Sequence, residues 1–375
     1  MKLKAFLKQM IDIDASDVFI VPGLPLSYEI GGVQHRMGEE RLTPADTEDF
    51  IRGMYDLANR NIALFTENIN HDDDFSLAVS GIGRFRANVF RQRGTYGCIL
   101  RVIPFGLPDA EHYEIPEEVL CCADYRKGLV LVTGPAGVGK STTLACMVDR
   151  LNHRRHSHII TLEDPIEHVH SHGTCIVTQR EIPTDIASYP EALRSAMRES
   201  PDILLVGEMR DMETIETAIK AAEMSQLLFS TLHTNGAAAS IERIVDSFPA
   251  SRQHQIRVQL SLTLQAVISQ QLIPTIEGKV TPAFEIMHCN TAIRSLIREN
   301  KTHQIDSVIA SSGNEGMVTM DQSLFKLLKE GRIDKETAMQ YSTHKEALET
   351  RIANDPELKN HEASKHGQHS KQDEQ

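Results

Sequence analysis

Residues 134–141 read Gly-Pro-Ala-Gly-Val-Gly-Lys-Ser, and this stretch decides the fold of the 375-residue chain. The apolar run Leu129–Val132 precedes it, and Thr142–Ala145 follows it. The spacing is that of G-x-x-x-x-G-K-[ST], a pattern that has physical meaning where it joins a buried strand to the first turn of a helix. The sequence therefore predicts a strand, a phosphate-binding loop and a helix in succession, with an ordinary glycine-rich turn as the alternative.

The predicted loop has the residue types that phosphate binding needs. Glycines allow backbone torsions that other residues avoid, so that consecutive N–H groups and the following helix N-terminus can point at an anion. Lys140 would reach the β- and γ-phosphates of a nucleoside triphosphate, and the Ser141 hydroxyl would ligate Mg²⁺. The residues expected to bind the nucleotide are Gly134, Gly137, Val138, Gly139, Lys140, Ser141 and Thr142.

The composition of the chain indicates which kinds of partner it can bind and in which cellular compartment we expect it. The formal net charge of −13 disfavours nucleic acid as the main partner, because affinity for a phosphate backbone depends on clustered Lys and Arg. The six cysteines include no C-x-x-C pair, which argues against a zinc clip and a secreted disulfide framework. The N-terminal residues do not resemble a signal peptide, and no run of about 18 apolar residues occurs. We expect a cytoplasmic protein.

The pattern of apolar residues predicts an α/β chain with distinct parts. Residues 1–108 alternate short strands and helices, including a helix from Pro44 toward Leu57 with Thr43 as its N-cap. Residues 109–127 form the expected linker, and residues 128–290 the larger α/β domain. A helical region, 291–345, and a polar tail, 346–375, which we expect to be disordered, follow. In the larger domain, near-continuous apolar strands predict a parallel sheet covered on both faces, and residues 255–268 are expected to be helical.

Three predicted strands of that sheet end in side chains that can carry chemistry. Glu163 follows the strand 159–162, Glu208 follows the strand 203–206, and His233 follows the strand 227–231. Ligands bind at the carboxyl ends of such strands, where a carboxylate can polarise water or hold the water shell of a metal. Gly207 stands where many ATPases have a metal-ligating Asp, so Glu208 is expected to act on the metal through water. A charged strand end and a structural histidine are the alternatives for Glu163 and His233.

Arginines of the first domain form a second candidate group. Arg84 and Arg86 lie two residues apart and share one face of a predicted strand, and Arg101 lies near the end of a later strand. They could supply positive charge to a phosphate bound by a neighbouring subunit. A solvated basic strand edge is the alternative.

These motifs, in this order, resemble the retraction ATPases of bacterial type IV pili, within the larger group of secretion and pilus ATPases. The similarity runs from about residue 15 to about residue 329. The stretch Ala-Ile-Arg-Ser-Leu-Ile-Arg-Glu, 292–299, resembles a C-terminal helix motif tied to retraction in that family. The other segments that carry the resemblance are 83–88, 134–141, 161–167, 178–181, 205–211 and 230–234.

The resemblance implies a PAS-like N-terminal domain joined to a RecA-like ATPase domain, assembled as a homo-hexamer that binds ATP and Mg²⁺ between subunits. It implies a pilus-retracting motor at the inner face of the cytoplasmic membrane, held there only by an inner-membrane platform protein, with a paralogous retraction ATPase as a possible partner. Glu163 becomes the candidate general base, Glu208 the Walker B acid and His233 the second histidine of a histidine box. Arg84, Arg86 and Arg101 become arginines that act on the next subunit.

One departure from the family pattern leaves alternatives open. Gln226 stands where the family has the first histidine of that box, and a glutamine cannot change its charge near neutral pH. The alternatives are an assembly or export ATPase of a related secretion system and a weakly hydrolysing accessory subunit of a pilus motor. Relatives close to pilus assembly usually carry a four-cysteine zinc insertion, which this sequence lacks.

Overall fold

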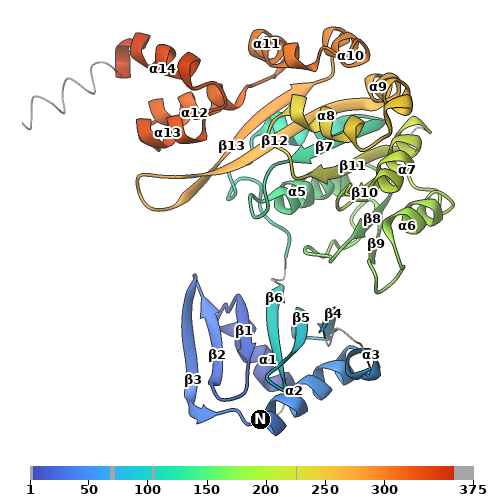
Figure 1. Cartoon of the computed structure of the whole chain (residues 1–375), viewed down its shortest axis with the longest axis vertical. Helices are drawn as coiled ribbons and strands as arrows, with labels where there is room; N and C mark the ends of the chain where they lie inside the picture. The colour runs from blue at the N-terminus through green and yellow to red at the C-terminus, as the bar shows by residue number, and fades with distance from the viewer. Residues whose placement is uncertain (1–2, 68–71, 104–105, 225, 359–375) are drawn as a thin grey trace, which may run out of the picture. The chain divides into compact units, whose positions relative to one another are not determined.

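The computed structural model describes residues 3–67, 72–103, 106–224 and 226–358 (Figure 1). Contacts divide the chain into two compact units. The N-terminal unit comprises residues 1–106 with 167–169. The second unit comprises residues 107–166 with 170–375 and is called the ATPase unit below, after the expectation stated above. Each is described by itself below.

The described part of the N-terminal unit has one antiparallel sheet of six strands, in the order β3-β2-β1-β6-β5-β4. Alternate residues of β5 face opposite sides: Phe85, Ala87 and Val89 are buried with α1 and α2, whereas Arg84 and Arg86 lie on the other face. This is the small PAS-like α+β fold that the resemblance implied. Its elements are α1 (Leu3–Asp12), β1 (Asp17–Ile20), β2 (Pro25–Ile30), β3 (Val33–Arg41), α2 (Pro44–Leu57), α3 (Ala63–Thr66), β4 (Asp72–Val79), β5 (Gly83–Gln92) and β6 (Thr95–Ile103).

Helix α2 begins where the sequence predicted. The Thr43 side chain accepts a hydrogen bond from the Asp46 N–H at 3.2 Å, and the Asp46 carboxylate accepts one from the Thr43 N–H at 2.7 Å. Pro44 is the first helical residue, where its missing N–H leaves no helical hydrogen bond unmade. The predicted N-cap is confirmed.

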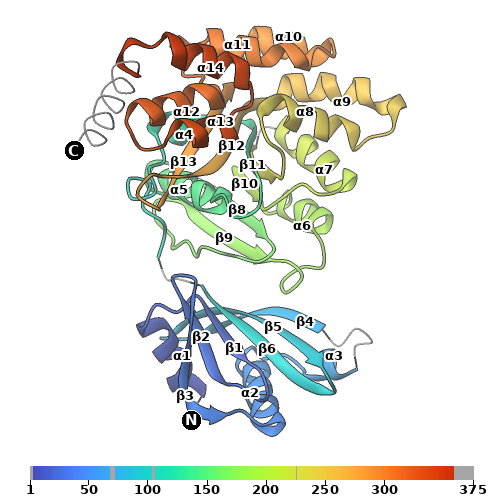
Figure 2. The ribbon, with the colours of Figure 1, turned by 60° about the vertical axis from the view of Figure 1, so that its left-hand side comes forward.

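The sheet of the ATPase unit has, among the described residues, seven strands in the order β13-β12-β7-β11-β10-β8-β9. All neighbours are parallel except β12 and β13. Figure 2 shows the helices around this sheet. The strands are β7 (Gly128–Thr133), β8 (His158–Glu163), β9 (Ile176–Glu181), β10 (Ile203–Val206), β11 (Leu227–Leu232), β12 (Leu264–Pro274) and β13 (Val280–His288).

Both faces of this sheet are covered, as the apolar strands predicted. Leu129 and Leu131 of β7 are buried in one cluster with α6–α9, and Val130 and Val132 in a second with α5. The result is the RecA-like α/β fold expected for this unit. Its helices up to the last parallel strand are α4 (Glu117–Leu120), η1 (Cys121–Asp124), α5 (Lys140–Arg154), α6 (Tyr189–Ala196), α7 (Met212–Glu223), α8 (Ala237–Asp246) and α9 (Ala250–Thr263).

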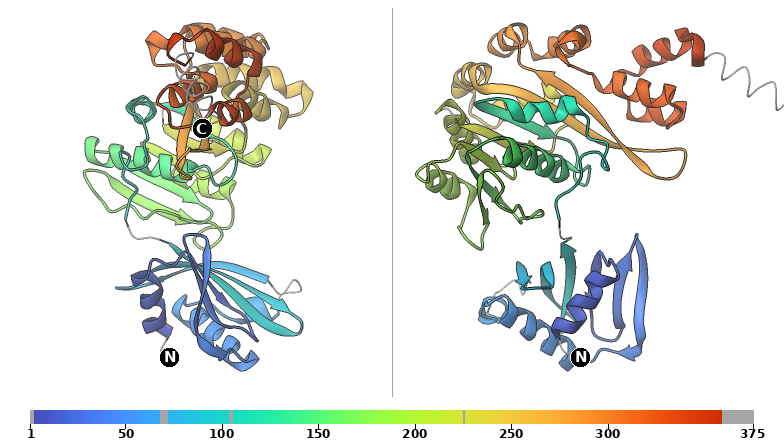
Figure 3. Two further views of the ribbon diagram at one scale, coloured as in Figure 1. Left: turned by 90° about the vertical axis from the view of Figure 1, so that its left-hand side faces the viewer. Right: turned by 180° about the vertical axis from the view of Figure 1, so that it is seen from behind.

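The C-terminal helices pack in two places. Ile293 and Ile297 of α10 are buried in the cluster that contains α9, whereas α12, α13 and α14 pack on the hairpin of β12 and β13, as Figure 3 shows at the right. No helix in the described ranges is long and apolar enough to cross a membrane. The C-terminal helices are α10 (Thr291–Arg298), η2 (Thr302–Gln304), α11 (Ile305–Ser311), η3 (Gly313–Glu315), α12 (Met320–Lys329), α13 (Lys335–Tyr341) and α14 (Lys345–Asn354).

One predicted helix is partly wrong. Residues 255–268 were expected to be helical, but α9 ends at Thr263 and residues 264–268 begin β12. Residues 264–268 are mostly apolar, and β12 is buried on both faces between β7 and β13, so periodicity alone does not distinguish it from a buried helix. Sequence analysis also missed β3, β9 and β13.

Two segments are more ordered than expected. Within the expected linker, 109–127, residues of α4 and η1 pack into the core: Val119, Cys122 and Ala123 are buried there. The expected disordered tail, 346–375, begins inside helix α14, whose Leu348 and Ile352 are buried against α12 and α13 because they share one helical face. Residues 359–375 lie outside the described residues.

Candidate active site

The register of the parallel sheet brings the predicted strand ends to one edge. Strands β7, β11, β10 and β8 are consecutive neighbours, with Val206 paired to both Leu162 and Ser230. Thr133, the last residue of β7, pairs with Leu232. Since carboxyl ends of parallel strands share one edge, the loop after β7 lies on the same edge as Glu163, Glu208 and His233.

The loop between β7 and α5 requires its glycines. Gly134, Gly137 and Gly139 have φ of 144°, 79° and 87°, a region that other residues rarely adopt. At Gly134 a Cβ atom would also collide with the Gln270 carbonyl oxygen. Gly139 is the N-cap of α5 and gives it no side-chain cap, so the first N–H groups of α5 can receive an anion.

Lys140, His233 and Glu208 form a connected group beside this loop. The Lys140 ammonium donates to the carbonyl oxygens of Gly134 at 2.8 Å and Pro135 at 2.7 Å, and its Nζ lies 3.5 Å from His233 Nδ1. His233 Nε2 lies 3.2 Å from Glu208 Oε2. In the tautomer with the proton on Nε2, His233 accepts from Lys140 and donates to Glu208. A change at the loop can thus reach the end of β10 through His233.

The two predicted acidic residues have different surroundings. Glu208 is buried and also forms an ion pair with Arg210. Glu163 accepts hydrogen bonds from the Thr161 hydroxyl at 2.6 Å and the Gln179 amide at 3.2 Å. These bonds fix the direction of the Glu163 carboxylate at the end of β8.

Tyr189, the first residue of α6, is a residue that sequence reasoning missed. Burial raises the pKa of its hydroxyl, and so do the negative charges of nearby Asp164, Glu208 and Glu163. A Cβ atom at Gly207 would lie 2.8 Å from the Tyr189 hydroxyl, so this hydroxyl occupies the space beside the glycine. No motif marks Tyr189, because it is far from Glu163 and Glu208 in sequence. Only the packing of α6 brings its hydroxyl close to these two residues.

The residues present fit a Mg²⁺ site completed by nucleotide. Within the described ranges no group of three or more His, Cys, Asp or Glu could hold a metal ion alone. Mg²⁺ commonly takes one or two protein ligands and completes its shell with phosphate oxygens and water. Ser141 in the first turn of α5 and buried Glu208 are the groups that would contribute.

The predicted arginines lie in the N-terminal unit, where they are described by themselves. Arg86 of β5 pairs directly with Arg101 of β6, so with Arg84 they share one face of that sheet. Arg86 is ion-paired with Asp74 at 2.6 Å, and Arg101 with Asp17 at 3.0 Å. The pairing of Arg86 with Arg101 was not foreseen from the sequence.

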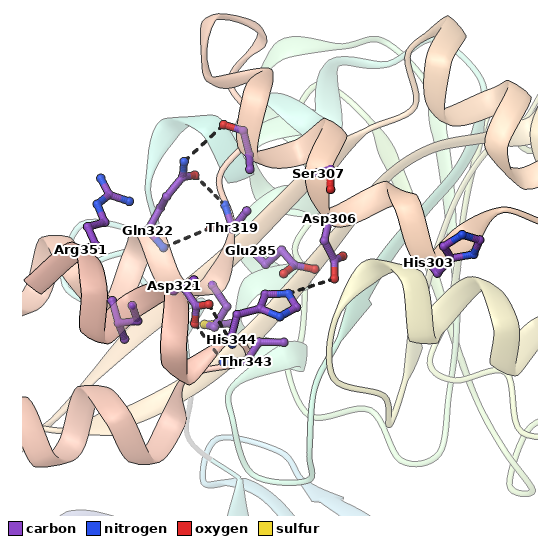
Figure 4. Close-up of a pocket in the computed structure, with 14 residues that line it drawn as sticks. Glu285, His303, Asp306, Ser307, Thr319, Asp321, Gln322, Thr343, His344 and Arg351 are labelled. Atoms are coloured by element: carbon purple, nitrogen blue, oxygen red, sulfur yellow. Dashed lines mark hydrogen bonds and ion pairs between the residues drawn. The ribbon is translucent and has the colours of Figure 1, made fainter.

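A cavity of about 420 Å³ lies among the C-terminal helices of the ATPase unit. Figure 4 shows Asp306 of α11 and His344 pointing toward each other, 3.3 Å apart, with Asp321 of α12 nearby. The Asp321 carboxylate accepts hydrogen bonds from the backbone N–H groups of Thr343 and His344 before α14. None of the residues that line the cavity was predicted as a site residue.

Comparison with known proteins agrees with this geometry. Residues 110–362 match the family described as Type II/IV secretion system protein. The chain is 46% identical over 325 residues to the type IV pilus retraction ATPase PilT of Pseudomonas aeruginosa, covering 86% of this chain and 93% of PilT. It is 38% identical to the type IV pilus ATPase PilU of that organism, covering 91% and 89% of the two chains.

A crystal structure of the pilus retraction motor PilT with bound ADP superposes with a TM-score of 0.86 at 45% identity, covering 93% of this chain and 99% of that one. The resemblance inferred from the motifs is confirmed, as are nucleotide binding and ATPase activity as the class of function. The chain belongs to the type II/IV secretion system protein family and, within it, to the PilT-like ATPases.

Proposed function

We propose that this protein is the Mg²⁺-dependent ATPase motor of type IV pilus retraction and works as a homo-hexamer. The observation that carries the proposal is the connected group of Lys140, His233 and Glu208 at the phosphate loop. Support comes from the similarity to PilT, which is named for pilus retraction, over most of both chains.

The site residues have distinct roles in the proposed reaction. The loop N–H groups and Lys140 bind the phosphates and neutralise charge that develops on them. Glu163, fixed by Thr161 and Gln179, orients or deprotonates the attacking water. Ser141 and Glu208 would hold Mg²⁺, which would supply further charge neutralisation. His233 contacts both Lys140 and Glu208 and is therefore placed to respond to the γ-phosphate.

The proposed assembly places nucleotide between subunits. Arg84, Arg86 and Arg101 would act on the phosphates bound by the next subunit, and Arg86 and Arg101 would exchange Asp74 and Asp17 for phosphate oxygens. Movement of the N-terminal unit of one subunit during hydrolysis would then transmit force. We place the hexamer at the cytoplasmic face of the inner membrane, on a pilus platform protein, without nucleic acid as a partner.

Two experiments test the motor proposal. Steady-state ATP hydrolysis by the purified protein is compared with that of Glu208→Gln, which keeps the size of the side chain but removes its charge. Turnover no higher than that of this variant would refute the motor proposal. In cells, deletion should leave long pili that do not retract, whereas cells without pili would indicate an assembly ATPase.

A second candidate is an accessory retraction subunit that hydrolyses ATP weakly. Gln226 favours it, because a glutamine cannot acquire charge near neutral pH. With its amide nitrogen turned toward them, Gln226 donates to the carbonyl oxygens of Ala221 at 2.6 Å and Met224 at 3.2 Å. The similarity to PilU over 91% of this chain also fits a paralogous role. Deletion with a second retraction ATPase present distinguishes the two: partial retraction supports the accessory role, and loss of retraction supports the main motor.

A further inference from the structure

Strand β12 places two adjacent polar residues on opposite faces of the sheet, next to the strand that leads into the phosphate loop. Ser269 and Gln270 are 1% and 3% exposed, and Ser269 pairs with Thr133 at the end of β7. Successive residues of a strand point to opposite faces. The two side chains therefore contact two different segments of the active-site edge.

Gln270 joins the phosphate loop to α5. Its amide nitrogen donates to the Val138 carbonyl oxygen at 2.7 Å, and its amide oxygen accepts from the Thr143 hydroxyl at 2.7 Å. Val138 lies in the loop, and Thr143 lies in the first turn of the helix that Lys140 begins. A buried amide with both ends bonded fixes the distance between these two segments, because leaving either group unpaired costs free energy.

Ser269 holds the segment that follows His233. Its hydroxyl oxygen accepts from the Gly236 N–H at 2.9 Å, and the carboxylate of Glu285 in β13 accepts from the next N–H, that of Ala237, at 2.8 Å. These residues begin α8, three positions after the histidine that contacts Glu208. The hairpin of β12 and β13 therefore fixes where the His233 segment turns into α8.

We propose that Gln270 and Ser269 are positioning residues for ATP hydrolysis, with Gln270 setting the phosphate loop and Ser269 setting the His233 segment. Without the two Gln270 hydrogen bonds, the loop would adopt its binding conformation only part of the time, and its affinity for nucleotide would fall in proportion. Gln270 therefore governs nucleotide affinity. Ser269 governs turnover, because His233 contacts both Lys140 and Glu208. The inference rests on the proposed site, but its first test measures binding alone.

The first test measures the Kd of a fluorescent ATP analogue. Gln270→Met keeps side-chain volume and removes both hydrogen bonds, and we expect affinity about tenfold weaker. Thr143→Val removes one bond and should weaken affinity about threefold, whereas Thr143→Ser restores the hydroxyl and should bind like the wild type. If Gln270→Met does not fold, the two Thr143 variants decide.

A matched control separates positioning from general damage. Thr281 of β13 is also fully buried and donates a 2.7 Å hydrogen bond, to Glu114. Thr281→Val should lose stability as Thr143→Val does but keep wild-type affinity. Wild-type affinity in both Gln270→Met and Thr143→Val, or an equal loss in Thr281→Val, would overturn the role of Gln270.

The second test measures turnover. Ser269→Ala should lower kcat about five- to tenfold and leave the Kd of the analogue within about twofold of the wild type. A loss of affinity without a change in kcat would overturn the role of Ser269. If the wild type does not hydrolyse ATP, the motor proposal fails, and the affinity series still decides the role of Gln270.

Discussion

The contact between Gly207 and Tyr189 predicts a specific rescue. In Gly207→Ala, the new Cβ would lie 2.8 Å from the Tyr189 hydroxyl and 3.3 Å from the Leu162 carbonyl oxygen. Gly207 does not have a positive φ, so backbone strain does not add to the effect. Overpacking of this kind costs about 1–3 kcal/mol, and we expect about 2 kcal/mol because half-buried Tyr189 must move away from the α6 packing that holds it. In a Tyr189→Phe background the closer contact is gone, and the cost should fall by about 1 kcal/mol.

The assay is thermal unfolding of the four proteins of this double-mutant cycle, with the transition of the ATPase unit followed. Gly313→Ala is the matched control, because a Cβ there meets nothing within 4 Å, and its stability should change by less than about 0.5 kcal/mol. An equal cost of Gly207→Ala with and without the Tyr189 hydroxyl would refute the contact. The reasoning about why glycine occupies this strand end would then be wrong.

Three further predictions concern stability. Arg294→Ala should lower the stability of the ATPase unit by about 1–3 kcal/mol, because Arg294 donates to the Ser261 carbonyl at 2.7 Å and to the Gln265 side chain at 2.9 Å. The control is Arg298→Ala on the same helix: Arg298 is exposed, so this substitution should change the thermal unfolding of the unit little. Thr43→Ala should cost the N-terminal unit about 1 kcal/mol in urea unfolding, through the lost cap of α2. Hydrogen bonds from Arg252 and Lys220 lower the pKa of Glu216 from 4.5 to about 2, so its stabilisation is present above pH 4.5 and lost as pH falls toward 2. The Tm difference between wild type and Glu216→Gln should therefore shrink between pH 6 and pH 3, and a constant difference would contradict this pairing.

The parts of the fold that the sequence predicted are those with a local signal. The loop 134–141 and the N-cap at Thr43 have specific residue types at fixed spacing, and the apolar strands 129–132 and 203–206 lie in the central, fully buried part of the sheet. Strand β12 has no such signal. Its residues 264–268 are a short, mostly apolar run that directly follows α9, and only pairing with β7 makes them a strand.

The site residues also fall into those with a local sequence signal and those without one. Glu163, Glu208 and His233 were found because each directly follows an apolar strand, and the sheet register brings those ends to one edge. Tyr189 and Gln270 follow no such rule. Tyr189 reaches the acidic residues through the packing of α6, and Gln270 comes from a strand 130 residues after Lys140 in sequence, so their positions depend on tertiary structure alone.

Strand β12 gives a physical reason for the C-terminal region to be part of the site that begins at Gly134. At its start, Gln265 accepts hydrogen bonds from Arg294 of α10 and from the Cys289 N–H. Five residues later, Gln270 bonds the phosphate loop and α5. Between these two glutamines, residues 266–269 pair with β7 without interruption, so a displacement of α10 that shifts this part of β12 would also shift the groups that hold the loop. The helix that resembles the retraction motif is thus connected to the phosphate loop through β12, by the hydrogen bond from Arg294 to Gln265 at one end and the bond from Gln270 to Val138 at the other. Substitutions of Arg294 and of Gln270 remove these two connections separately.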